Sequence, residues 1–67
     1  MKVIVNGDER DFDVGTLAEL LEAIGIDLQA RGTAVALNGR VHGKSRWTVT
    51  EVADGDRIEV IRAVSGG

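Results

Sequence analysis

Few side chains in this 67-residue sequence are suited to catalysis, and this shortage narrows the possible functions. The chain contains no Cys, which excludes a thiol nucleophile, a disulfide and an iron–sulfur cluster. Its single His, His42, is too little for a metal site or a proton relay between two imidazoles. No Gly-rich phosphate-binding loop leads into a predicted helix. Any chemistry must therefore use carboxylates, hydroxyls, amines or the ends of the chain.

The C-terminal pair Gly66-Gly67 is the strongest candidate for chemistry. Glycine lacks a Cβ, so such an end can thread a narrow channel, and its terminal carbonyl is open to attack. Adenylation by ATP would turn the Gly67 carboxylate into a mixed anhydride. Attack by a persulfide or sulfide would then give a thiocarboxylate, which is a sulfur nucleophile. We therefore predict a sulfur carrier; the alternative is a frayed end that tolerates small residues.

Three apolar side chains are candidates for docking a partner. Strand alternation places Ile4 and Ile61 on the sheet face opposite the predicted helix, where two isoleucines on neighbouring strands would form a small exposed patch. We expect this patch to seat the activating enzyme; the alternative is two ordinary exposed apolar residues. Trp47 is either an interface anchor or a half-buried plug of the core.

The first element that positions these residues is a β-hairpin. Residues 1–6 alternate as a strand, and Asn6-Gly7 favours a type I′ turn because both of its central positions need positive φ. Residues 10–14 resume the alternation, which predicts a second strand with Phe12 and Val14 on one face.

A short helix is predicted next. Thr16 and Glu19 have the spacing of a capping box, in which each side chain accepts from the backbone N–H of the other. Gly25 stands where a helix commonly ends in the left-handed conformation. The apolar face between these two signals is formed by Leu17, Leu20, Leu21 and Ile24.

The second half of the chain is predicted to be mostly strand. We expect an inner strand at residues 33–38, a second Asn-Gly hairpin at Asn38-Gly39 and a short strand at 40–42. After an irregular stretch, Val49 and Val52 are expected in the core, and Asp54-Gly55-Asp56 reads as a tight turn rather than a metal loop. The last strand covers residues 57–63, and residues 64–67 form a flexible tail.

These elements predict an α+β fold of order β-β-α-β-β-β. A mixed sheet of about four to five strands with one helix packed across it is a ubiquitin-like β-grasp, in which the first and last strands lie side by side and parallel. Residues 1–67 would form a single domain. A hydrophobic fraction of 43% is ample for one core.

Charge and hydropathy limit the partners. A net charge of −3 disfavours nucleic acid and suits docking on a basic patch of another protein. The sequence has no apolar run long enough for a membrane span, and residues 1–6 lack the pattern of a signal peptide. A cytoplasmic location is the expectation.

The whole chain resembles the thiamine-biosynthesis sulfur carrier proteins, the ThiS family. The resemblance includes the opening strand with Asn6-Gly7, the helix start at 15–21, the stretch at 36–39 and the Arg46-Trp47 region. Its most specific stretch is 54–67, in which Asp-Gly-Asp, a hydrophobic strand and the terminal Gly-Gly follow in fixed order.

The resemblance implies a set of partners rather than a cofactor bound by this chain. An E1-like (ThiF-like) adenylyltransferase would use ATP to adenylate Gly67. A cysteine desulfurase, with or without a sulfurtransferase, would supply sulfur, and a thiazole synthase (ThiG-like) would consume the thiocarboxylate. The resemblance also implies that Gly67 is the modified residue, and that Gly66 and Ser65 thread the partner's active site.

Three other hypotheses about the function stay open at this point. The small subunit of molybdopterin synthase shares the fold and tail, but tends to be longer and to carry an aromatic, proline-containing stretch before Gly-Gly. This chain has no Pro and no aromatic residue after Trp47. The other two readings are a ubiquitin-like protein modifier and a structural β-grasp domain without tail chemistry.

Overall fold

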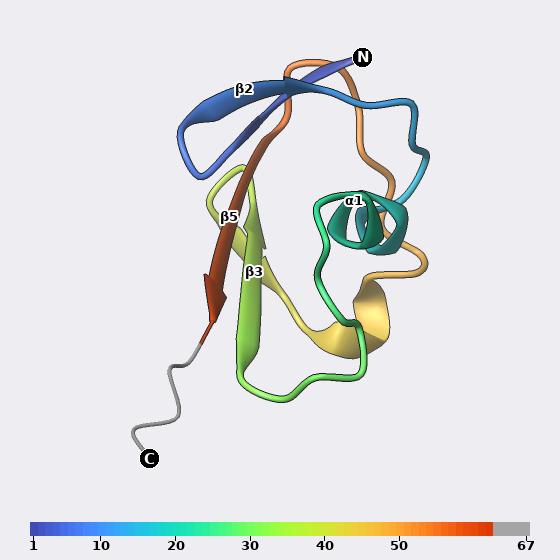
Figure 1. Cartoon of the computed structure of the whole chain (residues 1–67), viewed down its shortest axis with the longest axis vertical. Helices are drawn as coiled ribbons and strands as arrows, with labels where there is room; N and C mark the ends of the chain where they lie inside the picture. The colour runs from blue at the N-terminus through green and yellow to red at the C-terminus, as the bar shows by residue number, and fades with distance from the viewer. Residues whose placement is uncertain (63–67) are drawn as a thin grey trace.

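The computed structural model describes residues 1–62, and within them one helix packs across one face of a five-stranded mixed sheet (Figure 1). The strand order β2-β1-β5-β3-β4 places the last strand in the middle, parallel to the first. This arrangement confirms the predicted β-grasp and the inner position of β3. The elements are β1 (Lys2–Val5), β2 (Asp8–Asp11), α1 (Leu17–Ala23), β3 (Thr33–Leu37), β4 (Arg40–His42), a 3₁₀ turn η1 (Lys44–Arg46) and β5 (Arg57–Arg62).

Both Asn-Gly pairs form the predicted hairpin turns. Asn6 and Gly7 have φ of 49° and 85°, and Asn38 and Gly39 have φ of 51° and 84°. These positive values at both central positions are those of a type I′ turn, whose twist matches that of the two strands it joins. The two hairpins therefore fix the local register of β1 with β2 and of β3 with β4.

The second strand differs from its predicted range of 10–14. The two-residue turn pairs Val5 directly with Asp8, so β2 begins at once and ends at Asp11 opposite Lys2. All four of its residues are exposed on this edge strand, and charged side chains of this kind discourage pairing with other chains. Phe12 and Val14 come after the strand and pack, partly buried, against the core.

Helix α1 has the predicted signals at both ends. The Glu19 N–H donates to Thr16 Oγ1 at 3.2 Å, and the Thr16 N–H donates to Glu19 Oε1 at 3.0 Å, which completes the capping box. At the other end the Gly25 N–H donates to the Glu22 carbonyl and the Ile26 N–H to the Leu21 carbonyl, as in a Schellman motif. The face between these ends is buried at Leu17, Leu20 and Leu21, each 0% exposed.

Between η1 and β5 the chain packs against the start of α1. The Leu17 N–H donates to the Thr50 carbonyl at 2.8 Å, and the Val52 N–H to the Gly15 carbonyl at 3.0 Å. Val52 is buried, as predicted, but Val49 is 62% exposed, so its predicted core position is wrong. Val49 lies in a backbone turn in which its N–H donates to the Arg46 carbonyl, and the segment contacts α1 through Thr50 and the residue Gly15 before the helix through Val52.

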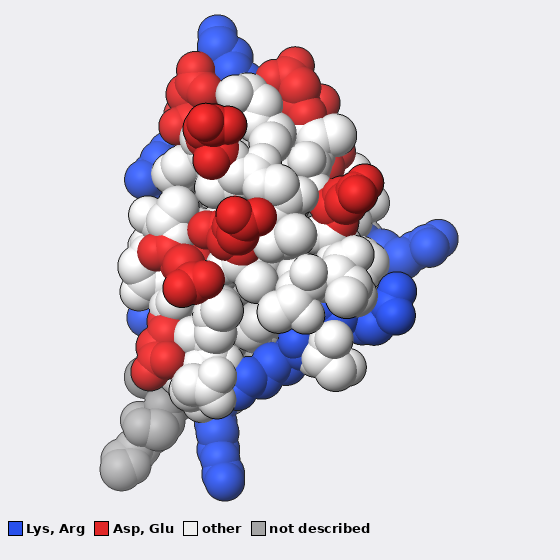
Figure 2. Space-filling model, turned by 90° about the vertical axis from the view of Figure 1, so that its right-hand side faces the viewer, with Lys and Arg blue, Asp and Glu red and all other residues white. Residues whose placement is uncertain are grey.

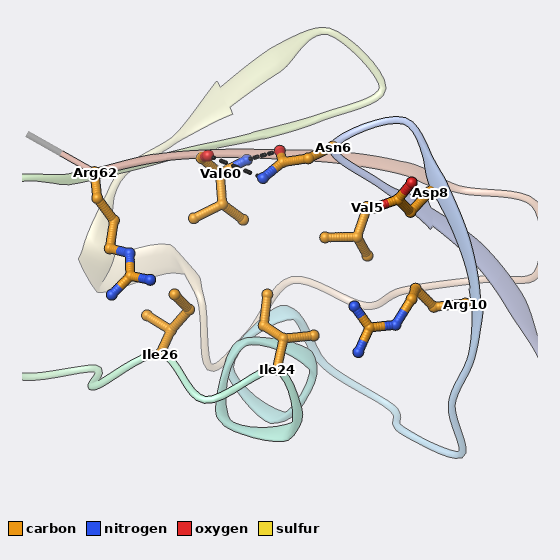
Figure 3. Close-up of a pocket in the computed structure, with 8 residues that line it drawn as sticks. All are labelled: Val5, Asn6, Asp8, Arg10, Ile24, Ile26, Val60 and Arg62. Atoms are coloured by element: carbon orange, nitrogen blue, oxygen red, sulfur yellow. Dashed lines mark hydrogen bonds between the residues drawn. The ribbon is translucent and has the colours of Figure 1, made fainter.

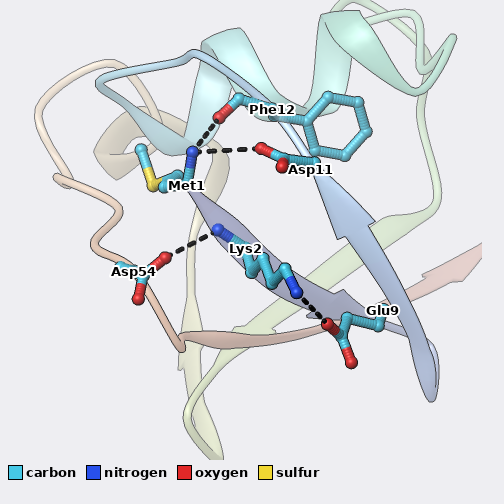
Figure 4. A network of polar contacts seen from close by, with 6 residues as sticks. All are labelled: Met1, Lys2, Glu9, Asp11, Phe12 and Asp54. Atoms are coloured by element: carbon cyan, nitrogen blue, oxygen red, sulfur yellow. Dashed lines mark hydrogen bonds and ion pairs between the residues drawn. The ribbon is translucent and has the colours of Figure 1, made fainter.

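A set of polar contacts joins the start of β1 to the turn that precedes β5 (Figure 4). The Lys2 N–H donates to the Asp54 carboxylate at 2.7 Å, and the Gly55 N–H donates back to the Lys2 carbonyl at 2.6 Å. The Asp56 carboxylate accepts from the Ala53 N–H at 2.7 Å. Both carboxylates of the Asp-Gly-Asp stretch therefore serve the turn, and residues 1–62 hold no cluster of side chains suited to a metal ion. No helix among the described residues is long and apolar enough to cross a membrane.

Candidate functional site

The predicted site at Ser65, Gly66 and Gly67 lies outside the described residues, so the structure bears on the strand that leads to it. That strand, β5, ends at Arg62. It pairs with β3 over its full described length except for Arg57, from Leu37 opposite Ile58 to Thr33 opposite Arg62. The chain is thus held in the sheet up to the last residue that the structure describes.

On its other side β5 extends beyond the end of its neighbour β1, and the side chain of Asn6 continues the pairing there. The regular parallel pairing with β1 ends at Val5 opposite Ile58. Beyond it, Asn6 Oδ1 accepts from the Val60 N–H at 2.8 Å, and Asn6 Nδ2 donates to the Val60 carbonyl at 3.3 Å (Figure 3). One amide side chain therefore serves both backbone groups of Val60, as a further residue of β1 would.

The second Asn-Gly turn holds the beginning of the same strand. The Arg57 N–H donates to Asn38 Oδ1 at 2.9 Å, and Asn38 Nδ2 donates to Asp56 Oδ1 at 3.0 Å. The Asn38 N–H also donates to the Arg57 carbonyl at 2.7 Å. Both turn asparagines thus bond to β5 or to the residue before it, and together they fix the strand that carries the C-terminal segment.

We expect Asn6→Gly to lower the free energy of unfolding by about 1–2 kcal/mol, because the turn keeps its positive φ but both bonds to Val60 are lost. Chemical denaturation measures this change. Hydrogen exchange at the Val60 amide should quicken more than at the other β5 amides. Asn6→Asp is the matched control: it keeps an acceptor for the Val60 N–H, and its free energy of unfolding should lie between those of Asn6→Gly and wild type. Wild-type stability and Val60 protection in Asn6→Gly would contradict the role given to this side chain.

Ile4 and Ile61 lie on the sheet face away from α1, as predicted, but they are not neighbours. Ile4 is opposite Arg57, whereas Ile61 is four residues further along β5 and opposite Ala34 of β3. At about 3.3 Å per residue this offset is roughly 13 Å. Ile4 is partly buried and Ile61 is 65% exposed. The single patch predicted for the two isoleucines is therefore wrong, and the exposed member of the pair, Ile61, lies near the end of β5.

Trp47 belongs to the core rather than to the surface. Its side chain is 3% exposed and lies in the main hydrophobic cluster, and its Nε1 donates to the His42 carbonyl at 3.0 Å. A ring so deeply buried has no face left for a partner, so the docking role predicted for Trp47 is wrong. The indole thus adds a large side chain to the core and satisfies the carbonyl at the end of β4.

Charge is unevenly spread over the face that bears α1 and η1 (Figure 2). Asp and Glu side chains spread over its upper part and left side, whereas most of the visible Lys and Arg side chains lie at the right and bottom, with a few more at the top and left edge. Within residues 1–62 the carboxylates in ion pairs are Asp11, with the amino group of Met1, and Glu9, with Lys2. Most charges of this face therefore stay available for long-range attraction to a partner.

Sequence reasoning missed the bonds of Asn6 and Asn38 to β5. An Asn-Gly pair predicts the backbone conformation of a turn. It does not predict which groups the Asn side chain will meet. Which strand comes to lie there is decided by the sheet order, which brings residues 54 positions apart into contact.

A single helix across a mixed sheet, with the last strand central and parallel to the first, defines a β-grasp domain of the ubiquitin-like class. Residues 3–67 match the model of the ThiS family. A sulfur carrier protein ThiS of Thermus thermophilus is 35% identical, over 97% of this chain and 98% of that protein. The crystal structure of a thiamine biosynthesis protein (ThiS) from Geobacter metallireducens matches at a TM-score of 0.81 with 34% identity, over the whole of both chains.

The chain belongs to the ThiS family, the sulfur carrier proteins of thiamine biosynthesis. A further relative is larger: a thiazole synthase of Paramagnetospirillum magneticum is 37% identical over the whole of this chain, which spans 20% of its length. The named relatives favour the thiamine branch over the molybdenum-cofactor alternative.

Proposed function

We propose that the carboxylate of Gly67 is the group that carries sulfur, and that Gly66 and Ser65 thread the active site of the activating enzyme. The observation that supports this proposal most is the family match, which extends to Gly67 itself. The pairing of β5 as far as Arg62 adds a physical reason. A strand fixed in the middle of the sheet gives the segment after it a defined starting point from which to enter a partner.

The proposed chemistry begins with adenylation. A Gly67 carboxylate oxygen attacks the α-phosphorus of ATP, pyrophosphate leaves, and an acyl-adenylate forms. Attack by hydrosulfide then expels AMP and yields the thiocarboxylate directly. Attack by a persulfide yields an acyl disulfide instead, and a second thiol must cleave its S–S bond to release the thiocarboxylate. This chain has no Cys, so that thiol must come from a partner.

The proposal assigns all catalytic groups to partner enzymes. An E1-like adenylyltransferase binds ATP and activates the tail, a cysteine desulfurase or sulfurtransferase supplies sulfur, and a thiazole synthase consumes it. The larger relative supports the last partner, because a segment similar to this whole chain is part of a protein named thiazole synthase. Two proteins whose counterparts share one polypeptide are good candidates for direct contact.

The outer sheet face at Ile61 is the proposed seat of the activating enzyme. Ala34 lies opposite Ile61, and on the next row of the same face Ala36 lies between Glu59 of β5 and Val41 of β4, which is 72% exposed. The two small alanines leave a shallow surface, with Glu59 at its side, that another protein can cover. Ile4 lies apart from this surface and remains a second candidate.

We expect Ile61→Asp to raise the dissociation constant for the activating enzyme about tenfold or more, since a desolvated apolar contact becomes a buried charge. The side chain is 65% exposed, so the melting temperature should change little. Val49→Asp is a matched control, because Val49 is 62% exposed and lies in the loop after η1. Equal affinity losses in the two variants would contradict a specific seat at Ile61.

Intact mass spectrometry of the chain from its native host tests the proposed function. A sulfur carrier should show a fraction heavier by the difference between one sulfur and one oxygen atom, located at Gly67 by fragmentation. Covalent adducts of this chain on lysines of other proteins would instead indicate a modifier. A single unmodified mass under conditions of thiamine synthesis would contradict the proposal.

A further inference from the structure

A cavity of about 240 Å³ lies between the sheet and the end of α1, on the face opposite Ile61 (Figure 3). Its lining combines aliphatic side chains (Val5, Val60, Ile24 and Ile26) with polar and charged ones (Asn6, Asp8, Arg10 and Arg62). Arg62 stands at one end and Arg10 at the other, and both guanidinium groups point toward the aliphatic side chains (Figure 3). We call this cavity the Arg10–Arg62 slot.

The two arginines give the slot a positive charge that residues 1–62 do not neutralise by ion pairing. The ion pairs of this part of the chain join Met1 to Asp11 and Lys2 to Glu9, so neither guanidinium is in one. Asp8 also lines the slot but pairs with neither arginine there. A carboxylate entering the slot would gain charge-assisted hydrogen bonds from a planar guanidinium.

Arg10 is also held in place. Its guanidinium carbon lies 5.4 Å from the centroid of the Phe12 ring, within the range of a cation–π contact. Phe12 is itself anchored, because its ring packs against the core and its N–H donates to the Met1 carbonyl at 3.0 Å. An arginine positioned in this way loses less conformational entropy when it binds a carboxylate.

The size of the slot favours a protein side chain over a cofactor. At about 240 Å³ it is smaller than the roughly 300–1,000 Å³ of typical small-molecule sites. The amide of Asn6 is engaged with Val60, so the charged groups of the lining that face a ligand are the two guanidinium groups and the Asp8 carboxylate. The complementary occupant is an aliphatic side chain beside a carboxylate.

We propose that the Arg10–Arg62 slot is a second docking pocket for the activating enzyme, and that it receives an aliphatic side chain adjacent to an Asp or Glu on one segment of that enzyme. Val60 and Arg62 belong to β5, the strand that leads to the C-terminal residues, so the slot lies on the strand from which the tail starts. Contacts on both faces of the sheet would hold β5 from two sides and orient the tail. The identity of the partner in this inference rests on the proposed function. The kind of ligand that the slot binds does not, because it follows from the lining of the slot.

The chemistry of the slot can be tested without any partner. The probe is 4-methylpentanoate, an aliphatic carboxylate, titrated into the ¹⁵N-labelled full chain, with its neutral amide as the control ligand. We expect saturable shifts at the amides of Arg10, Ile26 and Arg62, weak shifts with the amide, and no saturable shift in Arg10→Glu. Equal shifts with both ligands, or shifts spread over the whole protein, would overturn the inference.

The second measurement is the affinity of the purified activating enzyme for variants of the carrier. Arg10→Glu should weaken binding about tenfold, and Arg10→Lys by a smaller factor because it keeps the charge but loses the planar fork. Arg40→Glu, at the distant edge strand β4, makes the same change in net charge and should weaken binding less than about twofold. Equal losses for Arg10→Glu and Arg40→Glu would mean that net charge alone acts, and would overturn the pocket.

Failure of the inference and failure of the proposed function are distinguishable. If wild type is adenylated at Gly67 but Arg10→Glu binds and reacts like wild type, the pocket is wrong and the function stands. If wild type neither binds the enzyme nor is adenylated, the proposed partner is wrong, and the titration with 4-methylpentanoate still decides whether the slot binds aliphatic carboxylates. If the Arg10→Glu carrier still binds the activating enzyme, it should show a raised KM and an unchanged kcat for adenylation, since Arg10 touches no reacting atom.

Discussion

Deletion of Gly67 should abolish ATP-dependent modification of the chain while leaving its free energy of unfolding unchanged. The reacting carbonyl would then belong to Gly66, one residue short of the position at which the activating enzyme holds the α-phosphate. A misplacement of even about 1 Å can cost two orders of magnitude in rate, and one residue of extended chain spans roughly 3.3 Å. Stability should not change, because the core described in residues 1–62 keeps all of its members.

Two matched variants sharpen the Gly67 experiment. A chain lengthened by one alanine keeps Gly66-Gly67 but moves the carboxylate outward, and it should be as inactive as the deletion. Arg40→Ala, on the edge strand β4, should be adenylated like wild type. Pyrophosphate exchange with the activating enzyme measures the first step, and mass spectrometry measures the thiocarboxylate. Pyrophosphate exchange at the wild-type rate in the deletion variant would show that another group is activated and would refute the proposed role of Gly67.

Trp47→Ala should strongly destabilise the protein. Truncating a buried Trp typically costs about 3–5 kcal/mol. A chain of 67 residues has a total stability of roughly 3–10 kcal/mol, so this single change removes a large part of it. The variant also leaves the His42 carbonyl without the indole donor at 3.0 Å. Thermal melting followed by far-UV circular dichroism measures the loss, since the variant has no other Trp to report by fluorescence.

Trp47→Phe separates packing from hydrogen bonding at the same position. It keeps an aromatic ring in the core but cannot donate to His42, so its loss of about 1–2 kcal/mol should be well below that of Trp47→Ala. Folded Trp47→Phe should bind the activating enzyme with wild-type affinity. A folded, stable Trp47→Ala that had lost only partner binding would restore the docking role that the buried position of Trp47 contradicts.

Several elements were predictable from short stretches of sequence. The turns at Asn6-Gly7 and Asn38-Gly39, the capping box of Thr16 and Glu19, and the end of α1 at Gly25 all match their predictions. Each depends on contacts within a few residues, so the local sequence contains nearly all of the relevant energetics. The central position of the last strand was predictable from element order, because few topologies connect these elements without a crossing.

The candidate site was less predictable. Gly66 and Gly67 were predicted from residue type and position, and they lie outside the described residues. The docking surface was wrong in two respects: Ile4 lies opposite Arg57 and not beside Ile61, and Trp47 is buried. Alternation tells which face of a strand a residue occupies, but not how far two strands are shifted along each other.

The sequence by itself therefore determined the order and kind of the main elements, the fold class and the absence of a thiol. The tertiary structure decided what each side chain touches: Asn6 bonds to Val60, Trp47 lies in the core, and Arg10 and Arg62 face one cavity. These contacts join residues that are far apart along the chain, such as Arg10 and Arg62. Backbone conformation is set by neighbouring residues, whereas the register of β1, β3 and β5 is set only when the whole core packs at once.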